Sequence, residues 1–152
     1  MGEVISPMSG KVISIEDVDD PIFSEKVSGD GVAVILDSPV VYAPVSGEIS
    51  VFFDTKHAFM ITADNGVQVL VHIGLDSIIM EGVGITAFKN RGERVEAGEK
   101  IVEIDLPFFK RRHINMVSPI LVVNYEKLKK LEYKNVGNDV EAGKDIVLDY
   151  EI

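Results

Sequence analysis

Histidine is the side chain in this sequence best suited to nucleophilic or acid–base chemistry at neutral pH. There are three histidines and no cysteine, which excludes thiolate nucleophiles, thiolate zinc sites and disulfides. His57 and His72 lie in apolar segments on either side of the turn sequence Asp64-Asn65-Gly66. His113 follows Lys110-Arg111-Arg112, a basic run that favours a solvated helix end. The candidate chemistry therefore rests on His57 and His72.

The Asn65-Gly66 dipeptide predicts how the two histidines are related. Asn-Gly tolerates the positive φ angles of a two-residue type I′ turn between antiparallel strands. Such a turn pairs Phe59 with His72 and His57 with Gly74. One face of the hairpin then holds both histidines, together with Thr55, Phe59, Ile61, Leu70 and Gly74. A diagonal cross-strand pair lies about 7 to 8 Å apart at the backbone, so both imidazoles can contact one small anion.

His72 has the surroundings of a nucleophile, since both of its neighbours are β-branched and apolar. An imidazole there keeps an in-plane lone pair on one nitrogen if the other nitrogen donates to a carbonyl. The carbonyl of Gly74 is the expected acceptor, and glycine lets another molecule approach closely. Thr55 is expected to orient His57 through its hydroxyl, so that His57 donates to a phosphate.

The same residues permit other interpretations. Two hydrogen-bonded histidines in a β core fit the pattern, as does a zinc pair, although no third ligand occurs at nearby spacing. A hydrolase triad of Ser77, His72 and Asp76 lacks the Gly-x-Ser-x-Gly elbow. Gly29-Asp30-Gly31 lacks the lysine of a phosphate-binding loop and places an acid there. Pattern alone leaves the core and zinc interpretations open.

Short β-branched runs separated by turn signals predict an all-β fold that positions these residues. The runs cover residues 32–36, 49–53, 58–62, 67–73 and 120–123. Helical patterning is confined to residues 124–131, where Asn124 is a candidate cap, and to one turn near Pro107.

Two internal echoes predict a duplicated architecture. Residues 6–13 and 43–50 share a Pro-x-Ser-Gly turn followed by an apolar run, and residues 95–102 match residues 140–147 almost residue for residue. We therefore expect an antiparallel β-sandwich or barrel built from two interlocking half-motifs, with one or two short helices.

Length and charge narrow the class of protein further. A chain of 152 residues predicts a single domain covering 1–152. Its net charge of −10 disfavours a nucleic-acid binder, which needs a basic surface, and suits a basic partner. No apolar stretch approaches the length of a spanning helix, about 18 residues, so we expect no insertion into a membrane.

The segment from Gly66 to Ile78 resembles the phosphorylation-site motif of glucose-type IIA components of the bacterial sugar phosphotransferase system. The resemblance covers nearly the whole chain, including residues 6–10, 16–18, 29–31, 43–47, 55–59 and 105–107. It departs at Ser77, where threonine is usual, and at Ile85, where phenylalanine is common. The family fold is an antiparallel β-sandwich of duplicated half-motifs, in agreement with the echoes.

The resemblance implies that His72 accepts a phosphoryl group from the phosphocarrier HPr and passes it to the IIB domain of a sugar permease. It makes His57 the assisting histidine, Thr55 the residue that positions His57, and the Gly74 carbonyl the group that holds the tautomer of His72. Partner docking falls to an apolar surface flanked by two acids that meet a basic residue of the carrier. The positions are Ile22, Phe23, Phe53, Leu70 and Ile78, with Asp20 and Asp76 as the acids.

On this interpretation the protein is a phosphotransferase component of the cytoplasm, including the inner face of the membrane where a permease holds it. The resemblance implies no cofactor, no metal and no nucleic-acid partner. A non-catalytic regulatory binding domain of the same fold is the alternative. The motif does not identify the sugar, because a IIA domain never needs to touch it.

Overall fold

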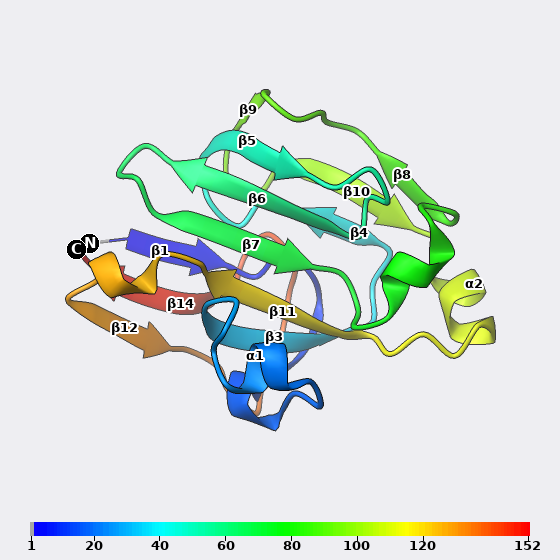
Figure 1. Ribbon diagram of the computed structural model, residues 1–152, viewed down its shortest axis with the longest axis horizontal. Helices are drawn as coiled ribbons and strands as arrows, with labels where there is room; N and C mark the ends of the chain where they lie inside the picture. Colours follow the sequence, from blue (N-terminus) through cyan, green and yellow to red (C-terminus); the bar gives the residue numbers. More distant parts are fainter. Residues whose placement is uncertain (1) are drawn as a thin grey trace.

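A computed structural model describes residues 2–152, and their strands form three antiparallel sheets (Figure 1). The largest sheet positions the candidate histidines, because it contains the predicted hairpin near its centre. In spatial order its strands are β13 (Asp139–Val140), β2 (Gly10–Ser14), β3 (Asp30–Leu36), β11 (Val117–Val122), β7 (Gln68–His72), β6 (Ala58–Ala63), β5 (Gly47–Phe52) and β9 (Arg94–Val95). The predicted all-β class is confirmed.

Two three-stranded sheets complete the main core. One contains β1 (Gly2–Ile5), β14 (Ile146–Glu151) and β12 (Lys130–Tyr133), and the other contains β4 (Val40–Tyr42), β10 (Lys100–Ile104) and β8 (Ile85–Ala87). β1 pairs with β14, so the two ends of the described chain lie side by side (Figure 1). One apolar cluster joins all three sheets, with fully buried members such as Val4, Ile101, Val34 and Val71. Alternation along each strand supplies this inward-facing set.

A second, smaller apolar cluster lies on the other face of the large sheet. Ala33 and Leu121 project to it because they alternate with the main-core residues of β3 and β11. The connection between β2 and β3 covers this cluster with Ile15, Val18 and Phe23. That connection contains a single 3₁₀ turn, η1 (Ile15–Asp17), and the short helix α1 (Pro21–Ser24).

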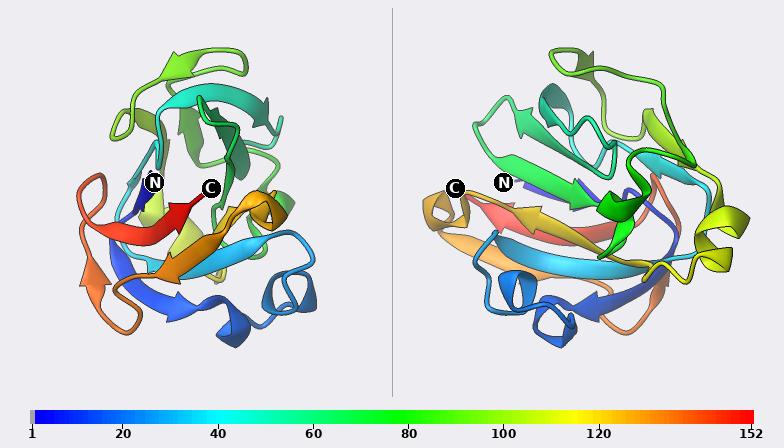
Figure 2. Two further views of the ribbon diagram at one scale, coloured as in Figure 1. Left: turned by 90° about the vertical axis from the view of Figure 1, so that its left-hand side faces the viewer. Right: turned by 45° about the vertical axis from the view of Figure 1, so that its right-hand side comes forward.

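The helices are short and peripheral, as expected (Figure 2). Besides α1 there is α2 (Leu106–Arg111), which confirms the turn expected near Pro107 and is capped by Asp105, whose carboxylate accepts from the Phe108 amide at 3.1 Å. The remaining helical turns are η2 (Ser77–Met80) and η3 (Tyr125–Lys127). No helix among residues 2–152 has the length and apolarity needed to cross a membrane.

The expectation of a helix over residues 124–131 is wrong. Only one 3₁₀ turn forms there, and the chain then enters β12. The Asn124 side chain does not cap that turn. Its oxygen instead accepts from the Gln68 amide and its nitrogen donates to the Gly66 carbonyl, both at 2.9 Å. Asn124 therefore braces the β6–β7 hairpin, a tertiary role that local propensity cannot reveal.

The predicted register of that hairpin is also wrong by one residue. His72 pairs with Ala58 rather than Phe59, and the loop contains three residues, because the Ala63 amide donates to the Val67 carbonyl at 2.8 Å. Gly66 has a φ of 89°, whereas Asn65 does not have the positive φ that a type I′ turn requires. The Asn65 side chain accepts from the Val67 amide at 3.0 Å, which stabilises the longer loop.

The duplication predicted from the echoes is confirmed in the strand order. Reading the large sheet from either edge gives corresponding strands, so that β2, β3 and β11 in one unit match β5, β6 and β7 in the other. The second unit is continuous from β4 to β10 and interrupts the first between β3 and β11. The small sheets obey the same correspondence, with β14 between β1 and β12 and β10 between β4 and β8.

The echoed turns also make equivalent hydrogen bonds. The Ser46 hydroxyl accepts from the Ala97 amide at 2.8 Å, and the Ser9 hydroxyl accepts from the Ala142 amide at 2.9 Å. We expect Ser9→Ala and Ser46→Ala each to lower the free energy of unfolding by about 1 kcal/mol, since each leaves a backbone donor without its partner.

Urea unfolding of the two single variants and the double variant tests this expectation. The two effects should add, because the turns are in different units. Ser28→Ala is the matched control, since the Ser28 hydroxyl makes no hydrogen bond within residues 2–152. Equal stability of the double variant and the parent would contradict the expectation.

Candidate functional site

His72 is the last residue of β7, and its ring lies on the face of the sheet opposite the main core. Alternation places Val69 and Val71 in the core, and Leu70 and His72 on the other face. The His72 Nδ1 atom lies 2.5 Å from the Gly74 carbonyl oxygen. A carbonyl only accepts, so Nδ1 carries the proton and Nε2 holds the lone pair of the neutral ring. The predicted tautomer is therefore the one this geometry requires.

The backbone at Gly74 is held from two sides. Its amide donates to the Ser118 hydroxyl at 2.9 Å, and Ser118 is fully buried in β11. Gly74 has a φ of 69°, and a Cβ there would lie 2.7 Å from the Asn115 carbonyl oxygen. Only glycine fits this position without strain. The hydroxyl that holds the Gly74 amide thus comes from β11, 44 residues later in the chain.

His57 precedes β6, at the end of a turn in which Lys56 has a φ of 60°. Its backbone carbonyl accepts from the Ile73 amide at 2.7 Å, so the predicted pairing of His57 with Gly74 is wrong. The ring is nevertheless directed toward His72, and its Nδ1 atom hydrogen-bonds the Thr55 hydroxyl, as expected. His57 is only 2% exposed, so this hydrogen bond satisfies a nitrogen that water cannot reach.

The two imidazoles converge, as the sequence predicts. Their ring centroids are 5.0 Å apart with an interplanar angle of 77°. Strand parity does not produce this contact, because the register differs and His57 lies outside the strand. The turn at Lys56, which has left-handed backbone geometry, directs His57 onto the face of His72.

Two phenylalanines extend the pair into a row of four rings. Phe23, from α1, meets the His72 ring edge-on at 5.3 Å between centroids, and Phe53 meets the His57 ring at 5.0 Å. Phe23 is buried by the second apolar cluster, whereas Phe53 is 43% exposed. Edge-to-face contacts of this kind fix ring orientation as well as burying apolar surface.

Burial keeps both imidazoles neutral near pH 7. Desolvation, with a smaller contribution from the charge of His72, lowers the pKa of His57 to about 4. Burial also lowers the pKa of His72, although the hydrogen bond to the Gly74 carbonyl and the negative charge of Asp20 oppose that shift. A neutral imidazole has the free lone pair that a nucleophile needs.

The other predicted docking residues lie on elements that flank the rings. Asp20 caps α1, accepting from the Ile22 amide at 3.0 Å. Ile22 and Ile78 are 53% and 50% exposed, and Leu70 packs against the second apolar cluster. Asp76 is exposed at the start of η2, and neither a hydrogen bond nor an ion pair joins it to a histidine within residues 2–152.

Two serines help to hold the backbone of the site, a role that the sequence did not indicate for either of them. Ser118 holds the Gly74 amide, and Ser77 is fully buried with its hydroxyl donating to the Ile73 carbonyl. The Ser77 hydroxyl is therefore directed at backbone rather than at His72, which excludes the hydrolase triad. No local signal identifies Ser118, because its role depends on the pairing of β7 with β11. No group of three or more His, Asp or Glu side chains within residues 2–152 is arranged to hold a metal ion.

Comparison with known proteins gives a family match and similar relatives that cover most of the chain. The model of the family "phosphoenolpyruvate-dependent sugar phosphotransferase system, EIIA 1" matches residues 2–128. The glucose-specific EIIA component of Buchnera aphidicola is 35% identical over 96% of this chain and 89% of its own length, and that of Oceanobacillus iheyensis is 36% identical over 95% and 87%. The solved structure of glucose permease IIA from Mycoplasma capricolum is 37% identical and superposes with a TM-score of 0.88, covering 97% of this chain and 94% of that one.

The fold and these matches define a component of a sugar phosphotransferase system. Within that system, the chain belongs to the EIIA 1 family, whose curated members similar to it are glucose-specific EIIA components. The resemblance inferred from the sequence is thereby confirmed.

The low pKa of His57 predicts an acid-sensitive fold. The unfolded chain binds a proton at its ordinary value of 6.5, whereas folded His57 binds one only near 4, so unfolding takes up protons between these values. We expect the free energy of unfolding to fall on acidification across this window, with His57 contributing up to about 1.4 kcal/mol per pH unit.

Histidine NMR titration and urea unfolding at several pH values provide the measurements. His57→Gln should flatten the pH dependence relative to the parent, because glutamine keeps polar atoms but does not titrate. An imidazole of His57 that titrates near 6.5 in the folded protein would show that the ring is not desolvated.

Proposed function

We propose that His72 accepts a phosphoryl group on Nε2 from the phosphocarrier HPr and passes it to the IIB domain of a sugar permease. The observation that carries this proposal is the hydrogen bond of Nδ1 to the Gly74 carbonyl, which leaves Nε2 as the nucleophile. In the first step the Nε2 lone pair forms a bond to phosphorus while the N–P bond in the carrier breaks. The electron pair of that bond returns to the carrier's histidine. Residues 1–152 act as one IIA domain. The domain works in the cytoplasm or against a permease at the inner face of the membrane.

The Gly74 carbonyl supports this step in a second way. The phosphorylated imidazole keeps its Nδ1 proton and gains positive character, which strengthens a hydrogen bond to a carbonyl acceptor. Transfer between two histidines also keeps phosphorus on nitrogen donors of similar energy, so the protein has mainly to position the groups and screen charge. The reverse and onward transfers use the same geometry.

His57 assists by donating to the phosphoryl oxygens. When the Thr55 hydroxyl donates to Nδ1, the proton of the neutral His57 ring resides on Nε2, the nitrogen not engaged by Thr55. The arriving phosphoryl group carries about two negative charges. Because His57 is neutral and so has no ion pair to break, its Nε2–H group can donate directly to the phosphoryl oxygens. The 5.0 Å separation of the rings suits contact of both with one small anion.

The exposed apolar residues around the rings form the docking surface. Ile22, Phe53 and Ile78 are exposed, Phe23 and Leu70 are more buried, and together they exclude water from a phosphohistidine that would otherwise hydrolyse. Asp20 and Asp76 meet a basic residue of the carrier. The net charge of −10 favours the approach of a basic carrier.

Transfer of label from phosphoenolpyruvate through enzyme I and HPr tests the proposal. We expect an acid-labile, base-stable label on the parent and none on His72→Ala, because alanine has no nucleophile. His113→Asn is the control that should label like the parent, since His113 is exposed and asparagine tolerates its φ of 56°. A folded parent that takes no label from an active carrier would overturn the relay and favour the regulatory binding domain.

The role of Thr55 gives a second test. Thr55→Val removes the hydroxyl but keeps the shape, so the orientation and tautomer of His57 are no longer fixed. We expect the transfer rate to fall about tenfold, consistent with the loss of a hydrogen bond to a buried group. Thr55→Ser keeps the hydroxyl and should transfer within about twofold of the parent. Rapid-quench measurement of label transfer distinguishes the variants, and equal rates for Val and Ser would remove Thr55 from the mechanism.

A further inference from the structure

The connection between β2 and β3, residues 15–29, carries three of the proposed docking residues. Asp20 is half-buried, Ile22 is exposed, and Phe23 rests against the His72 ring. Its backbone folds back on itself, because the amides of Val27 and Ser28 both donate to the Ile22 carbonyl, at 3.1 and 3.2 Å. We call residues 15–29 the docking loop. What fixes this loop also fixes Phe23 at the candidate site.

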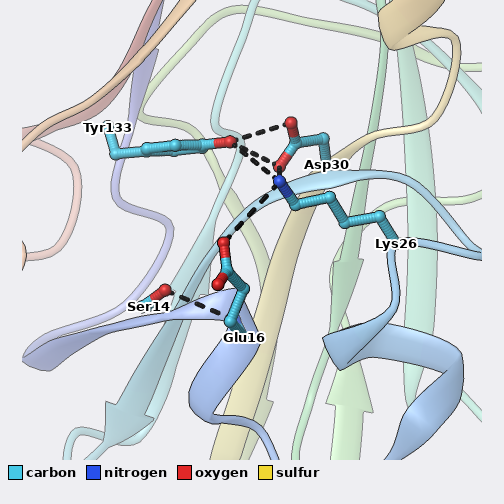
Figure 3. Close-up of polar contacts among 5 residues, drawn as sticks. All are labelled: Ser14, Glu16, Lys26, Asp30 and Tyr133. Atoms are coloured by element: carbon cyan, nitrogen blue, oxygen red, sulfur yellow. Dashed lines mark hydrogen bonds and ion pairs between the residues drawn. The ribbon is translucent and has the colours of Figure 1, made fainter.

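Two side chains of the docking loop, Lys26 and Glu16, belong to a charged cluster away from the site. Lys26 follows Phe23 closely, donates its amide to the Phe23 carbonyl at 3.0 Å, and has a φ of 59°. Its Nζ atom lies 3.6 Å from Asp30 Oδ1 and 3.5 Å from the Tyr133 hydroxyl oxygen (Figure 3). Glu16, 3.9 Å from the same Nζ atom, is mostly exposed. A left-handed lysine costs free energy, so interactions of its side chain have to offset that strain.

Tyr133 is the member of the cluster that comes from elsewhere in the fold. It is the last residue of β12, in the sheet with β14, whereas Asp30 is the first residue of β3. The Tyr133 hydroxyl oxygen is 2.8 Å from both carboxylate oxygens of Asp30. The Lys26 ammonium lies 5.9 Å from the centre of the Tyr133 ring. The Asp30 side chain is only 13% exposed, which strengthens these contacts relative to a surface pair.

The charges in this cluster are complementary. Burial disfavours the charged form of Lys26, but attraction to Asp30, Tyr133 and Glu16 outweighs it and raises the Lys26 pKa. Burial and the neighbouring Asp30 carboxylate raise the pKa of Tyr133, so its hydroxyl keeps its proton and donates. A cation, an anion and a neutral donor thus join the docking loop to two different sheets.

We propose that Tyr133 is a positioning residue for the phosphotransfer site. Its hydroxyl fixes the Asp30 carboxylate, the carboxylate fixes Lys26, and Lys26 fixes the turn of the docking loop that presses Phe23 against His72. Tyr133 touches neither histidine, so it acts on partner docking through the loop. The effect on transfer rests on the proposed function, whereas the effect on the His72 ring does not.

Tyr133→Phe is the variant that tests this proposal, because it removes one hydroxyl and keeps the ring beneath Lys26. We expect the NMR signals of the His72 imidazole to shift in the unphosphorylated protein, since the edge of Phe23 is no longer held against the ring. We expect the KM for phosphorylated HPr to rise about three- to tenfold, which corresponds to the net contribution of one ordinary hydrogen bond, because the hydroxyl acts on docking only through the loop. The kcat should stay within about twofold of the parent, because the histidines and Thr55 are untouched.

Matched variants separate positioning from a loss of stability. Tyr125→Phe is the control, since Tyr125 precedes the same strand and its hydroxyl makes no hydrogen bond within residues 2–152. Lys26→Met should shift the His72 signals as Tyr133→Phe does, whereas Lys26→Arg should keep the parent spectrum. Adding Tyr133→Phe to Lys26→Met should shift the His72 signals little further, because both changes break the same chain of contacts.

Two results would overturn the proposal. Unchanged His72 signals in Tyr133→Phe would show that the docking loop does not depend on the hydroxyl. A fall in kcat with no change in KM would show that the hydroxyl acts on the chemistry or on stability rather than on docking. The spectrum is recorded without phosphate, so it decides the positioning role even if the parent protein accepts no label.

Discussion

The hydrogen bond between His72 Nδ1 and the Gly74 carbonyl is the interaction on which the site depends. It determines which nitrogen of the ring has a lone pair, and therefore where a new bond can form. The carbonyl lies beside Nδ1 because the chain turns at Gly74, two residues after the end of β7, where the glycine has a φ of 69°. Two residues hold this turn: Ser118, in β11, accepts from the Gly74 amide, and Asn115, just before β11, accepts from the Leu75 amide. A sheet of eight strands thus fixes the tautomer of one imidazole.

Burial and charge act in opposition around this bond. The aromatic row and the second apolar cluster favour neutral histidines, whereas Asp20 and the Gly74 carbonyl favour a positive His72 ring. The net result is a lowered pKa for His72, so the ring is neutral near pH 7 while two neighbouring groups still favour its cation. This combination favours the transfer that we propose, in which the ring gains positive character on forming a bond to phosphorus and loses it when the group leaves.

The sequence predicts features that depend on neighbouring residues or on repeated segments. It does not predict features that depend on contacts between residues far apart in the chain. Apolar periodicity identified the strands, and the Pro-x-Ser-Gly echoes identified the duplication, because each depends on neighbouring residues. The register at Asn65 could not be predicted, since two loop lengths suit the same dipeptide and the Asn65 and Asn124 side chains decide between them. The expected helix after Asn124 failed for the same reason. Ser118 and Tyr133 have no local signature at all, because their partners are 44 and 103 residues away.

The duplication also allows the residues at equivalent positions of the two units to be compared. Gly10 pairs with Leu36 in one unit and Gly47 with Ala63 in the other, so counting back along β3 and β6 makes Asp30 the counterpart of His57. Continuing across to β11 and β7 makes Leu121 the counterpart of His72. The same pair of positions thus holds two imidazoles in one unit, and in the other an acid that anchors Lys26 and a leucine that supports Phe23. Equivalent positions of the two units thus have different tasks in the site that we propose: one unit supplies the two histidines, and the other supplies the residues that support Phe23 beside His72.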